Sequence, residues 1–108
     1  MTDTDFVAVA GADELAVGQM KKVEVGGHRL LLAHAEDGFH CVDEMCSHED
    51  YSLYLGCIKD HRIKCSLHGS YFDLRTGAAL DEPACEPIRT YPVQIADGQV
   101  WVNPSAPR

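Results

Sequence analysis

Apolar and polar residues alternate along much of the chain, which predicts strands with one buried and one solvated face. In residues 20–25, for example, Val23 and Val25 alternate with charged neighbours. Leu30-Leu31-Leu32 instead forms an unbroken apolar run, which predicts a strand buried on both sides. By this reasoning we expect strands at residues 5–9, 20–25, 28–35, 39–43, 56–59, 62–65, 91–95 and 99–102.

Turn-forming residues separate these segments. Gly26-Gly27 supplies the positive φ angles of a tight hairpin turn, and Gly38 and Gly98 each end a similar short turn. Asp60-His61 predicts a turn without glycine, because both residue types tolerate the left-handed conformation. Pro92 cannot donate a ladder hydrogen bond, so its strand is expected at a sheet edge or with Pro92 facing away from the neighbouring strand.

The pattern predicts an all-β protein, since residues 10–15 could form a single helical turn capped by Asp13 and no segment is long enough for a proper helix. A length of 108 residues suits a single domain spanning residues 1–108. We expect strands near both chain ends to pair into an antiparallel sandwich base. A subdomain of residues from about 44 to 86 is then inserted in the middle.

The charge of the chain limits the kinds of partner. Its formal net charge is −8, which argues against nucleic acid and anionic membranes, because both require a basic face. The N-terminal residues 1–5 are acidic, and no apolar run approaches the roughly 18 residues of a membrane helix. We therefore expect a soluble, cytoplasmic protein without a signal peptide or a membrane anchor.

The chain contains five cysteines, an odd number that argues against a disulfide framework and favours a reducing compartment. Cys41 and Cys57 lie in predicted strands and are expected to be small buried side chains. Cys85 lies in a proline-bearing loop, and the sequence assigns no role to it. The other two cysteines, Cys46 and Cys65, each have a histidine close behind them.

These two cysteines begin two similar short motifs. The first is Cys46-Ser47-His48, and the second, Cys65-Ser66-Leu67-His68, follows after sixteen intervening residues. Each motif offers one thiolate and one imidazole, so together they predict a metal site with mixed ligands. The four candidate metal ligands are Cys46, His48, Cys65 and His68.

Several kinds of site could use such residues. A structural zinc site usually places like ligands together, whereas each motif here is mixed. A nucleophilic cysteine paired with a histidine would leave the second motif unexplained. A 2Fe–2S cluster, with two cysteines on one iron and two histidines on the other, uses both motifs.

In these two motifs the sequence closely resembles the Rieske family. The resemblance rests on the pattern C-x-H, sixteen residues, C-x-x-H-G, and it extends to Phe72-Asp73-Leu74, Thr76-Gly77, the loop at Pro83 and Tyr91-Pro92-Val93. It implies a Rieske fold with one 2Fe–2S cluster per chain. It also implies that Cys46 and Cys65 hold the inner iron, and that His48 and His68 hold the outer iron near the surface.

The sequence departs from some members of that family. Tyr51 and Leu67 stand where respiratory and photosynthetic Rieske proteins carry an extra cysteine pair, so that disulfide cannot form. Ser70 matches a serine that hydrogen-bonds a cluster sulfur in high-potential relatives, whereas Phe72 replaces the companion tyrosine. The resemblance therefore implies a potential in the lower part of the Rieske range.

The size of the chain is similar to that of the small Rieske-type ferredoxins of bacterial oxygenase systems. This resemblance implies a monomeric one-electron carrier, not an enzyme. It would take electrons from an NAD(P)H-dependent, flavin-containing ferredoxin reductase. It would pass them to the terminal Rieske non-haem iron oxygenase of an aromatic-ring-hydroxylating dioxygenase, whose substrate the sequence does not identify.

Two other functions fit the same residues. One is a small Rieske-type subunit of an assimilatory nitrite reductase, and the other is a zinc-binding interaction module. For the ferredoxin, we expect acidic residues near the two motifs to steer basic partner surfaces. These residues are Glu49, Asp50, Glu82 and Glu86.

Overall fold

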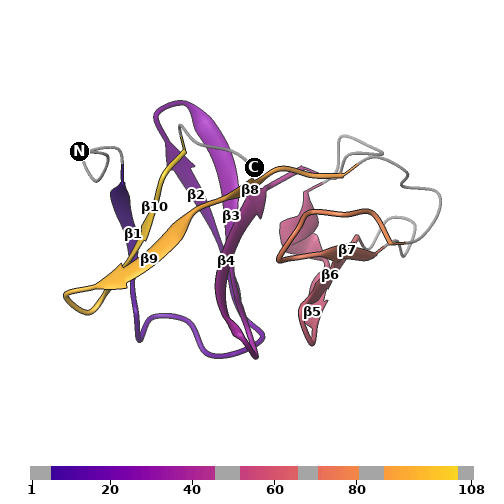
Figure 1. Cartoon of the computed structure of the whole chain (residues 1–108), viewed down its shortest axis with the longest axis horizontal. Helices are drawn as coiled ribbons and strands as arrows, with labels where there is room; N and C mark the ends of the chain where they lie inside the picture. Colours follow the sequence, from indigo (N-terminus) through magenta and orange to yellow (C-terminus); the bar gives the residue numbers. More distant parts are fainter. Residues whose placement is uncertain (1–5, 46–51, 66–70, 81–86, 105–108) are drawn as a thin grey trace.

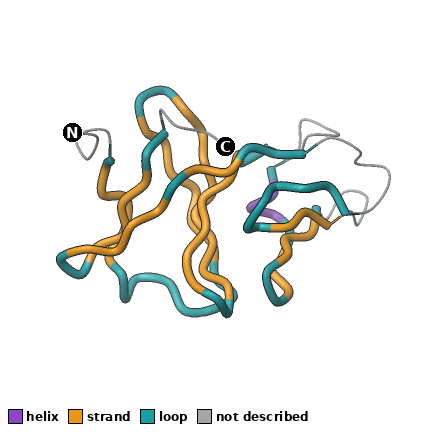
Figure 2. Tube along the Cα trace, in the orientation of Figure 1, coloured by secondary structure: helices purple, strands orange, loops and turns teal. Residues whose placement is uncertain are grey.

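The computed structural model describes residues 6–45, 52–65, 71–80 and 87–104. Within these ranges the chain forms strands, one short 3-10 helix and connecting turns (Figures 1 and 2). The strands are β1 Val7–Gly11, β2 Met20–Val25, β3 His28–Ala35, β4 Gly38–Asp43, β5 Cys57–Lys59, β6 Arg62–Lys64, β7 Tyr71–Asp73, β8 Thr90–Tyr91, β9 Val93–Ala96 and β10 Gln99–Val102, and the 3-10 helix is η2, Leu53–Leu55.

The described strands form three antiparallel sheets. Their orders are β1-β10-β9, β2-β3-β4-β8 and β5-β6-β7. The first strand pairs with the last, with Val7 opposite Val102. This pairing confirms that the two chain ends build the base together. The small β5-β6-β7 sheet lies at the other end of the long axis from the β9–β10 hairpin (Figure 1).

The central four-stranded sheet has a hydrophobic core on each face. Leu31 belongs to the core shared with the β5-β6-β7 sheet, which includes Ile63 and Phe72. Leu30 and Leu32 belong to the other core, which is shared with the β1-β10-β9 sheet. All three leucines are at most 1% exposed. The apolar run in β3 is therefore buried on both sides, as its sequence predicts.

The predicted turn residues have the expected backbone angles. Gly26 and Gly27 have φ angles of 57° and 84° between β2 and β3. Asp60 has a φ of 59° in the turn between β5 and β6, where the chain has no glycine. An aspartate tolerates this conformation better than most residues, so the turn forms without glycine.

The strand expected at residues 91–95 is divided at Pro92. Before it, β8 is an edge strand of the central sheet, and after it, β9 is an edge strand of the sheet containing β1. The chain thus passes from one sheet to the other at the residue that cannot donate a ladder hydrogen bond. The edge position predicted for this proline is confirmed.

The helical turn expected at residues 10–15 is wrong. The strand β1 continues to Gly11, and a tight turn follows in which Glu14 N donates to Gly11 O at 3.0 Å. The Glu14 carboxylate accepts a hydrogen bond from Gly11 N at 3.1 Å. Glu14, not the predicted Asp13, thus closes this turn.

No helix in the described part of the chain is long and apolar enough to cross a membrane.

Candidate metal centre

The structure places one of the four candidate ligands directly. Cys65 follows the last residue of β6 and is only 1% exposed. It belongs to the same core as Ile63, two residues earlier in β6. Cys46, His48 and His68 lie outside the described residues. The structure shows, however, how the chain enters and leaves the segments that contain them.

The first segment, residues 46–51, is closed at its base by backbone pairing. Met45 and Ser52 form an isolated antiparallel bridge. Next to it, Leu53 N donates to Glu44 O at 2.7 Å. Leu53 is fully buried in the core, so the residue after the loop has a fixed anchor. The residues that flank segment 46–51 on its two sides are therefore held together.

A buried carboxylate reinforces this base. Ser52 Oγ donates to Glu44 Oε2 at 2.6 Å, and Arg29 Nε donates to Glu44 Oε1 at 3.2 Å. The Glu44 side chain is 5% exposed, whereas the Arg29 side chain is 62% exposed. Because each carboxylate oxygen has a donor, the charge of Glu44 is compensated at a site shielded from water. We call Arg29, Glu44 and Ser52 the loop clamp.

The neighbouring Asp43 connects β4 to the segment that follows residues 81–86. Its Oδ1 accepts from Tyr91 Oη at 2.6 Å, and its Oδ2 accepts from Arg89 N at 3.0 Å. Burial and the hydrogen bond to Asp43 raise the pKa of Tyr91 to about 12, so this hydroxyl remains a donor at neutral pH. Asp43 and Glu44 are separated from the first motif only by Met45, and the sequence indicates only that they are acids near it.

Two glycines allow backbone segments to approach closely beside the loops. A Cβ at Gly56 would lie 1.7 Å from the carbonyl oxygen of Lys64, the residue before Cys65. A Cβ at Gly77 would lie 2.0 Å from the carbonyl oxygen of Ile88. Ile88 N donates to Gly77 O at 2.9 Å, and Gly77 has a φ of 80°. The second motif therefore begins at a strand end that packs against Gly56 without space for a side chain.

The other described cysteines differ from each other. Cys41 is 1% exposed, as predicted, and burial raises the pKa of its thiol to about 12. The prediction of a buried Cys57 is wrong, because this residue is exposed. In the edge strand β5 it alternates with Ile58, which packs against the core, and so it lies on the outer face. No two of the described cysteines form a disulfide.

These features fit a metal centre held by two loops. The described residues contain no group of three or more candidate metal ligands, since three of the four predicted ligands lie outside them. Cys65 supplies a buried sulfur donor at the end of a short strand. The soft thiolate suits iron–sulfur ligation, and so do the two loop bases, which the Met45–Ser52 bridge and the Lys64–Tyr71 strand pair close. The complete ligand set remains the prediction made from the sequence.

Replacing Ser52 by Ala tests the loop clamp without changing any charge. The variant loses the hydrogen bond to the buried carboxylate and the cap that Ser52 Oγ provides by accepting from Tyr54 N at 3.2 Å. We expect the free energy of unfolding to fall by about 2 kcal/mol, and the loaded centre to lose its metal faster. Thermal unfolding and the decay of visible absorbance in a chelator measure both effects.

Thr76→Ala is the matched control for this prediction. Thr76 Oγ1 also accepts a backbone hydrogen bond, from Ala78 N at 3.2 Å, but in an exposed turn with no buried carboxylate. Its loss should change the stability by less than about 1 kcal/mol. Equal effects of the two substitutions would contradict the role given to the clamp.

Residues 5–92 match the family described as Rieske [2Fe-2S] domain. The chain therefore belongs to the Rieske family. The anthranilate 1,2-dioxygenase ferredoxin subunit of Burkholderia cepacia is 42% identical over 102 residues, covering 94% of this chain and 94% of that protein. The family match confirms the fold class and the cofactor predicted from the sequence, a Rieske 2Fe–2S cluster.

Two solved structures are similar over most of the chain. The ferredoxin of carbazole 1,9a-dioxygenase from Nocardioides aromaticivorans has a TM-score of 0.88 and 30% identity, covering 93% of this chain and 98% of that one. A chain from the complex of reduced oxygenase and oxidised ferredoxin in carbazole 1,9a-dioxygenase has a TM-score of 0.85 and 27% identity, covering 91% and 92%.

Proposed function

We propose that this protein is a one-electron carrier of an aromatic-ring-hydroxylating dioxygenase system. It takes electrons from a flavin-dependent ferredoxin reductase and passes them to the terminal Rieske non-haem iron oxygenase. The observation that carries this proposal is the similarity to a dioxygenase ferredoxin over 93% of this chain and 98% of that one. Nearly the whole of this chain is thus similar to nearly the whole of that ferredoxin.

The proposal assigns the four ligands as the sequence predicts. Cys46 and Cys65 hold the inner iron of the cluster, and His48 and His68 hold the outer iron. The position of Cys65 supports this order, because its side chain is 1% exposed and the inner iron needs a buried thiolate. The residues of the loop clamp and Asp43 hold the loop bases in place around the cluster.

The mixed ligand set suits the intermediate potential that such a carrier needs. When bound, a Rieske cluster accepts and donates a single electron at about −150 mV or above, compared with about −400 mV for four-cysteine plant-type clusters. The difference of about 250 mV corresponds to about 6 kcal/mol for one electron. The protein contributes neutral imidazoles in place of two thiolates, and so less negative charge around the added electron.

We also infer the organisation and location of the chain. Residues 1–108 form a single domain, with the cluster-binding subdomain at about 44–86. The Met45–Ser52 bridge and the three-stranded β5-β6-β7 sheet within this range support that boundary. The carrier is a cytoplasmic monomer, which agrees with a reducing compartment and with the absence of disulfides among the described cysteines.

Metal analysis and reconstitution test the proposed function. The purified protein should be red-brown and contain two irons and two acid-labile sulfides per chain. Mixed with a dioxygenase reductase, NADH and the matching oxygenase, it should support substrate oxidation that stops when it is omitted. A colourless protein with one zinc per chain would instead favour the interaction module. Lack of transfer to any oxygenase, with the cluster intact, would exclude the carrier role.

A further inference from the structure

The outer face of the β5-β6-β7 sheet carries a group of cationic residues around a tyrosine. The strand register places Lys64 between Cys57 and Tyr71, and Arg62 between Lys59 and Asp73. The alternate residues of the same strands face the core. We call the outward set the cationic face; it consists of Cys57, Lys59, Arg62, Lys64, Tyr71 and Asp73.

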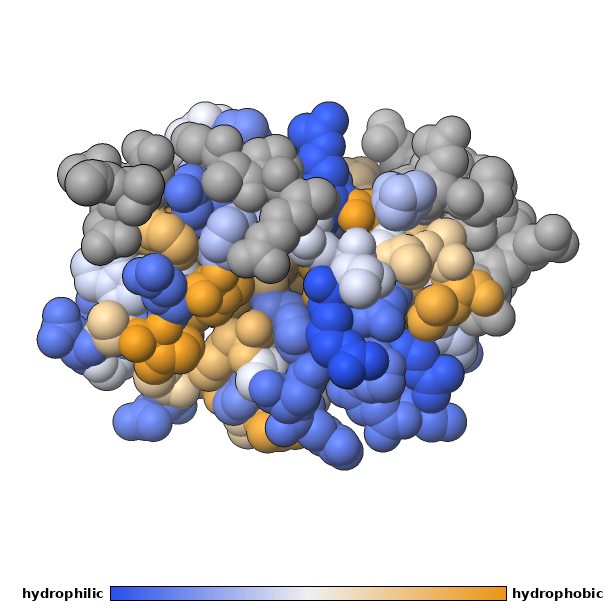
Figure 3. All heavy atoms as spheres, viewed as in Figure 1, coloured by the Kyte–Doolittle hydropathy of each residue, from blue (hydrophilic) through white to orange (hydrophobic). Residues whose placement is uncertain are grey.

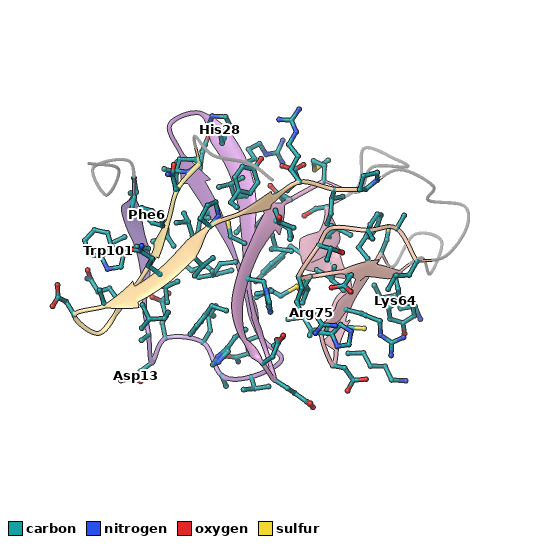
Figure 4. The ribbon with its side chains drawn as sticks, in the orientation of Figure 1. Phe6, Asp13, His28, Lys64, Arg75 and Trp101 are labelled. Atoms are coloured by element: carbon teal, nitrogen blue, oxygen red, sulfur yellow. The ribbon has the colours of Figure 1, made fainter. Side chains whose placement is uncertain are left out.

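This face differs in sign from the chain as a whole. The protein has 17 acidic and 9 basic residues and a net charge of −8. The cationic face instead carries Lys59, Arg62 and Lys64 against a single carboxylate, that of Asp73. Asp73 is itself paired with Arg75, at 3.6 Å. Hydrophilic residues gather over this end of the molecule in Figure 3, and Figure 4 shows Lys64 and Arg75 there.

Two of the three cations have no carboxylate partner within the part of the chain that the structure describes. Arg62 pairs with Asp60 at 3.4 Å, whereas neither Lys59 nor Lys64 is within 4.0 Å of a described carboxylate oxygen. The Nε atom of Arg62 is buried without a described hydrogen-bond acceptor. Positive charge on this face is therefore only partly neutralised by the described residues.

Protection of a sheet edge explains only part of this arrangement. Lysines on edge strands prevent unwanted pairing between sheets, and β5 with Lys59 is an edge strand. Arg62 and Lys64 lie in β6, which is the central strand and has neighbours on both sides. A central strand has no edge to protect, so its two cations need another explanation.

Tyr71 gives the face the composition of a protein interface. The Arg62 guanidinium carbon lies 5.2 Å from the centre of the Tyr71 ring, and Lys64 Nζ lies 5.9 Å from it. Both cations therefore lie within cation–π distance of a half-buried aromatic ring. Tyrosine and arginine are enriched in protein interfaces, where they supply contact area and charge-assisted hydrogen bonds.

The face also borders the second candidate ligand segment. Lys64 directly precedes Cys65, and Tyr71 directly follows residues 66–70, which contain His68. An electron-transfer partner that docks at this segment also covers residues beside it, because even a small transient interface buries up to roughly 600 Å² on each partner. The row formed by Cys57, Lys64 and Tyr71 lies at the end of the sheet where the chain leaves β6 for that segment and returns in β7.

We propose that the cationic face docks an acidic surface of an electron-transfer partner protein, with Lys64 and Arg62 paired to the partner's carboxylates beside its redox centre. The inference rests on the proposed carrier function and adds to it a docking surface of the opposite sign to the acidic residues near the ligand segments. The occupant is a protein that presents carboxylates, since the unneutralised charge on this face is positive.

Lys64→Glu tests the proposal against a variant of equal net charge. The substitution changes the net charge by −2, as does the double substitution Gln94→Glu and Gln99→Glu in β9 and β10. Both glutamines are exposed, and their hairpin lies at the far end of the long axis (Figure 1). Stopped-flow rates of reduction by the reductase and of reoxidation by the oxygenase are measured for each variant at low and high salt.

The proposal predicts that Lys64→Glu lowers the second-order rate with at least one partner by roughly tenfold at low salt. The loss should shrink at high salt, because salt screens the lost attraction. Lys59→Glu, farther from the ligand segment, should have a smaller effect. The glutamine variant should keep the wild-type rate within about twofold. If Lys64→Glu and the glutamine variant have equal rates with both partners, the proposal is wrong.

The same measurements separate this proposal from the carrier function. If the wild-type protein is neither reduced nor reoxidised at a useful rate, the carrier function fails before the variants are compared. If the wild-type protein transfers electrons and Lys64→Glu does so equally well, only the docking surface is wrong. The visible spectrum and thermal unfolding of each variant confirm that the cluster and the fold are intact.

Discussion

Cys65→Ala is expected to yield a folded protein that holds no 2Fe–2S cluster. The substitution removes a buried thiolate that the proposal places on the inner iron, and alanine offers no donor in its place. Iron and sulfide content should fall from two of each per chain to near zero, and the visible absorbance should disappear. Circular dichroism in the far ultraviolet shows whether the strands remain.

Cys57→Ala is the matched control, since it removes the same thiol from an exposed position on the outer face of β5. That variant should keep its full iron content and its spectrum. His48→Ala and His68→Ala extend the test to the other iron, and each should also abolish the Rieske spectrum. An intact spectrum in the Cys65, His48 or His68 variant would refute that ligand assignment.

Gly56→Ala is expected to destabilise the protein by about 3 kcal/mol or more. The added Cβ would lie 1.7 Å from the Lys64 carbonyl oxygen and 2.9 Å from its carbonyl carbon. Both are backbone atoms, so neither a rotamer change nor a small shift can relieve the clash. Because the displaced carbonyl precedes Cys65, cluster loading should fall as well. Denaturant unfolding and iron content measure the two effects.

Gly11→Ala provides the comparison for this substitution. A Cβ at Gly11 has only the Glu14 Cβ within reach, at 4.0 Å, which is an ordinary contact distance. We expect the free energy of unfolding of this variant to lie within about 1 kcal/mol of the wild-type value, and we expect the variant to keep its cluster. A loss of similar size in the two variants would mean that the close approach at Gly56 has no special role.

Local patterns predict the strands of the base well. The predicted bounds of residues 20–25, 28–35 and 99–102 agree with β2, β3 and β10. These segments alternate clearly or form a continuous apolar run, and turn residues end them. The exposed position of Cys57 could not be predicted in this way, because it depends on which side of a three-residue strand faces the core.

The candidate ligands follow from the spacing of cysteine and histidine, whereas their supports do not. Asp43 and Glu44 look like two more acids in an acidic chain, yet Glu44 is 4% exposed and Asp43 accepts hydrogen bonds from Tyr91 and Arg89. The partners of these carboxylates are 8 to 48 residues away in the sequence. Contacts at such separations depend on the tertiary fold, so no local pattern indicates them.

The leucine run of β3 has a consequence for any attempt to divide the protein. Since Leu31 completes the core above β6 and β7, an isolated fragment of residues 44–86 would lack the layer that covers Ile63 and Phe72. The remaining strands would in turn expose the Leu31 face of β3 to water. The cluster-binding subdomain therefore cannot be transferred to another scaffold by itself. The central sheet would have to be transferred with it.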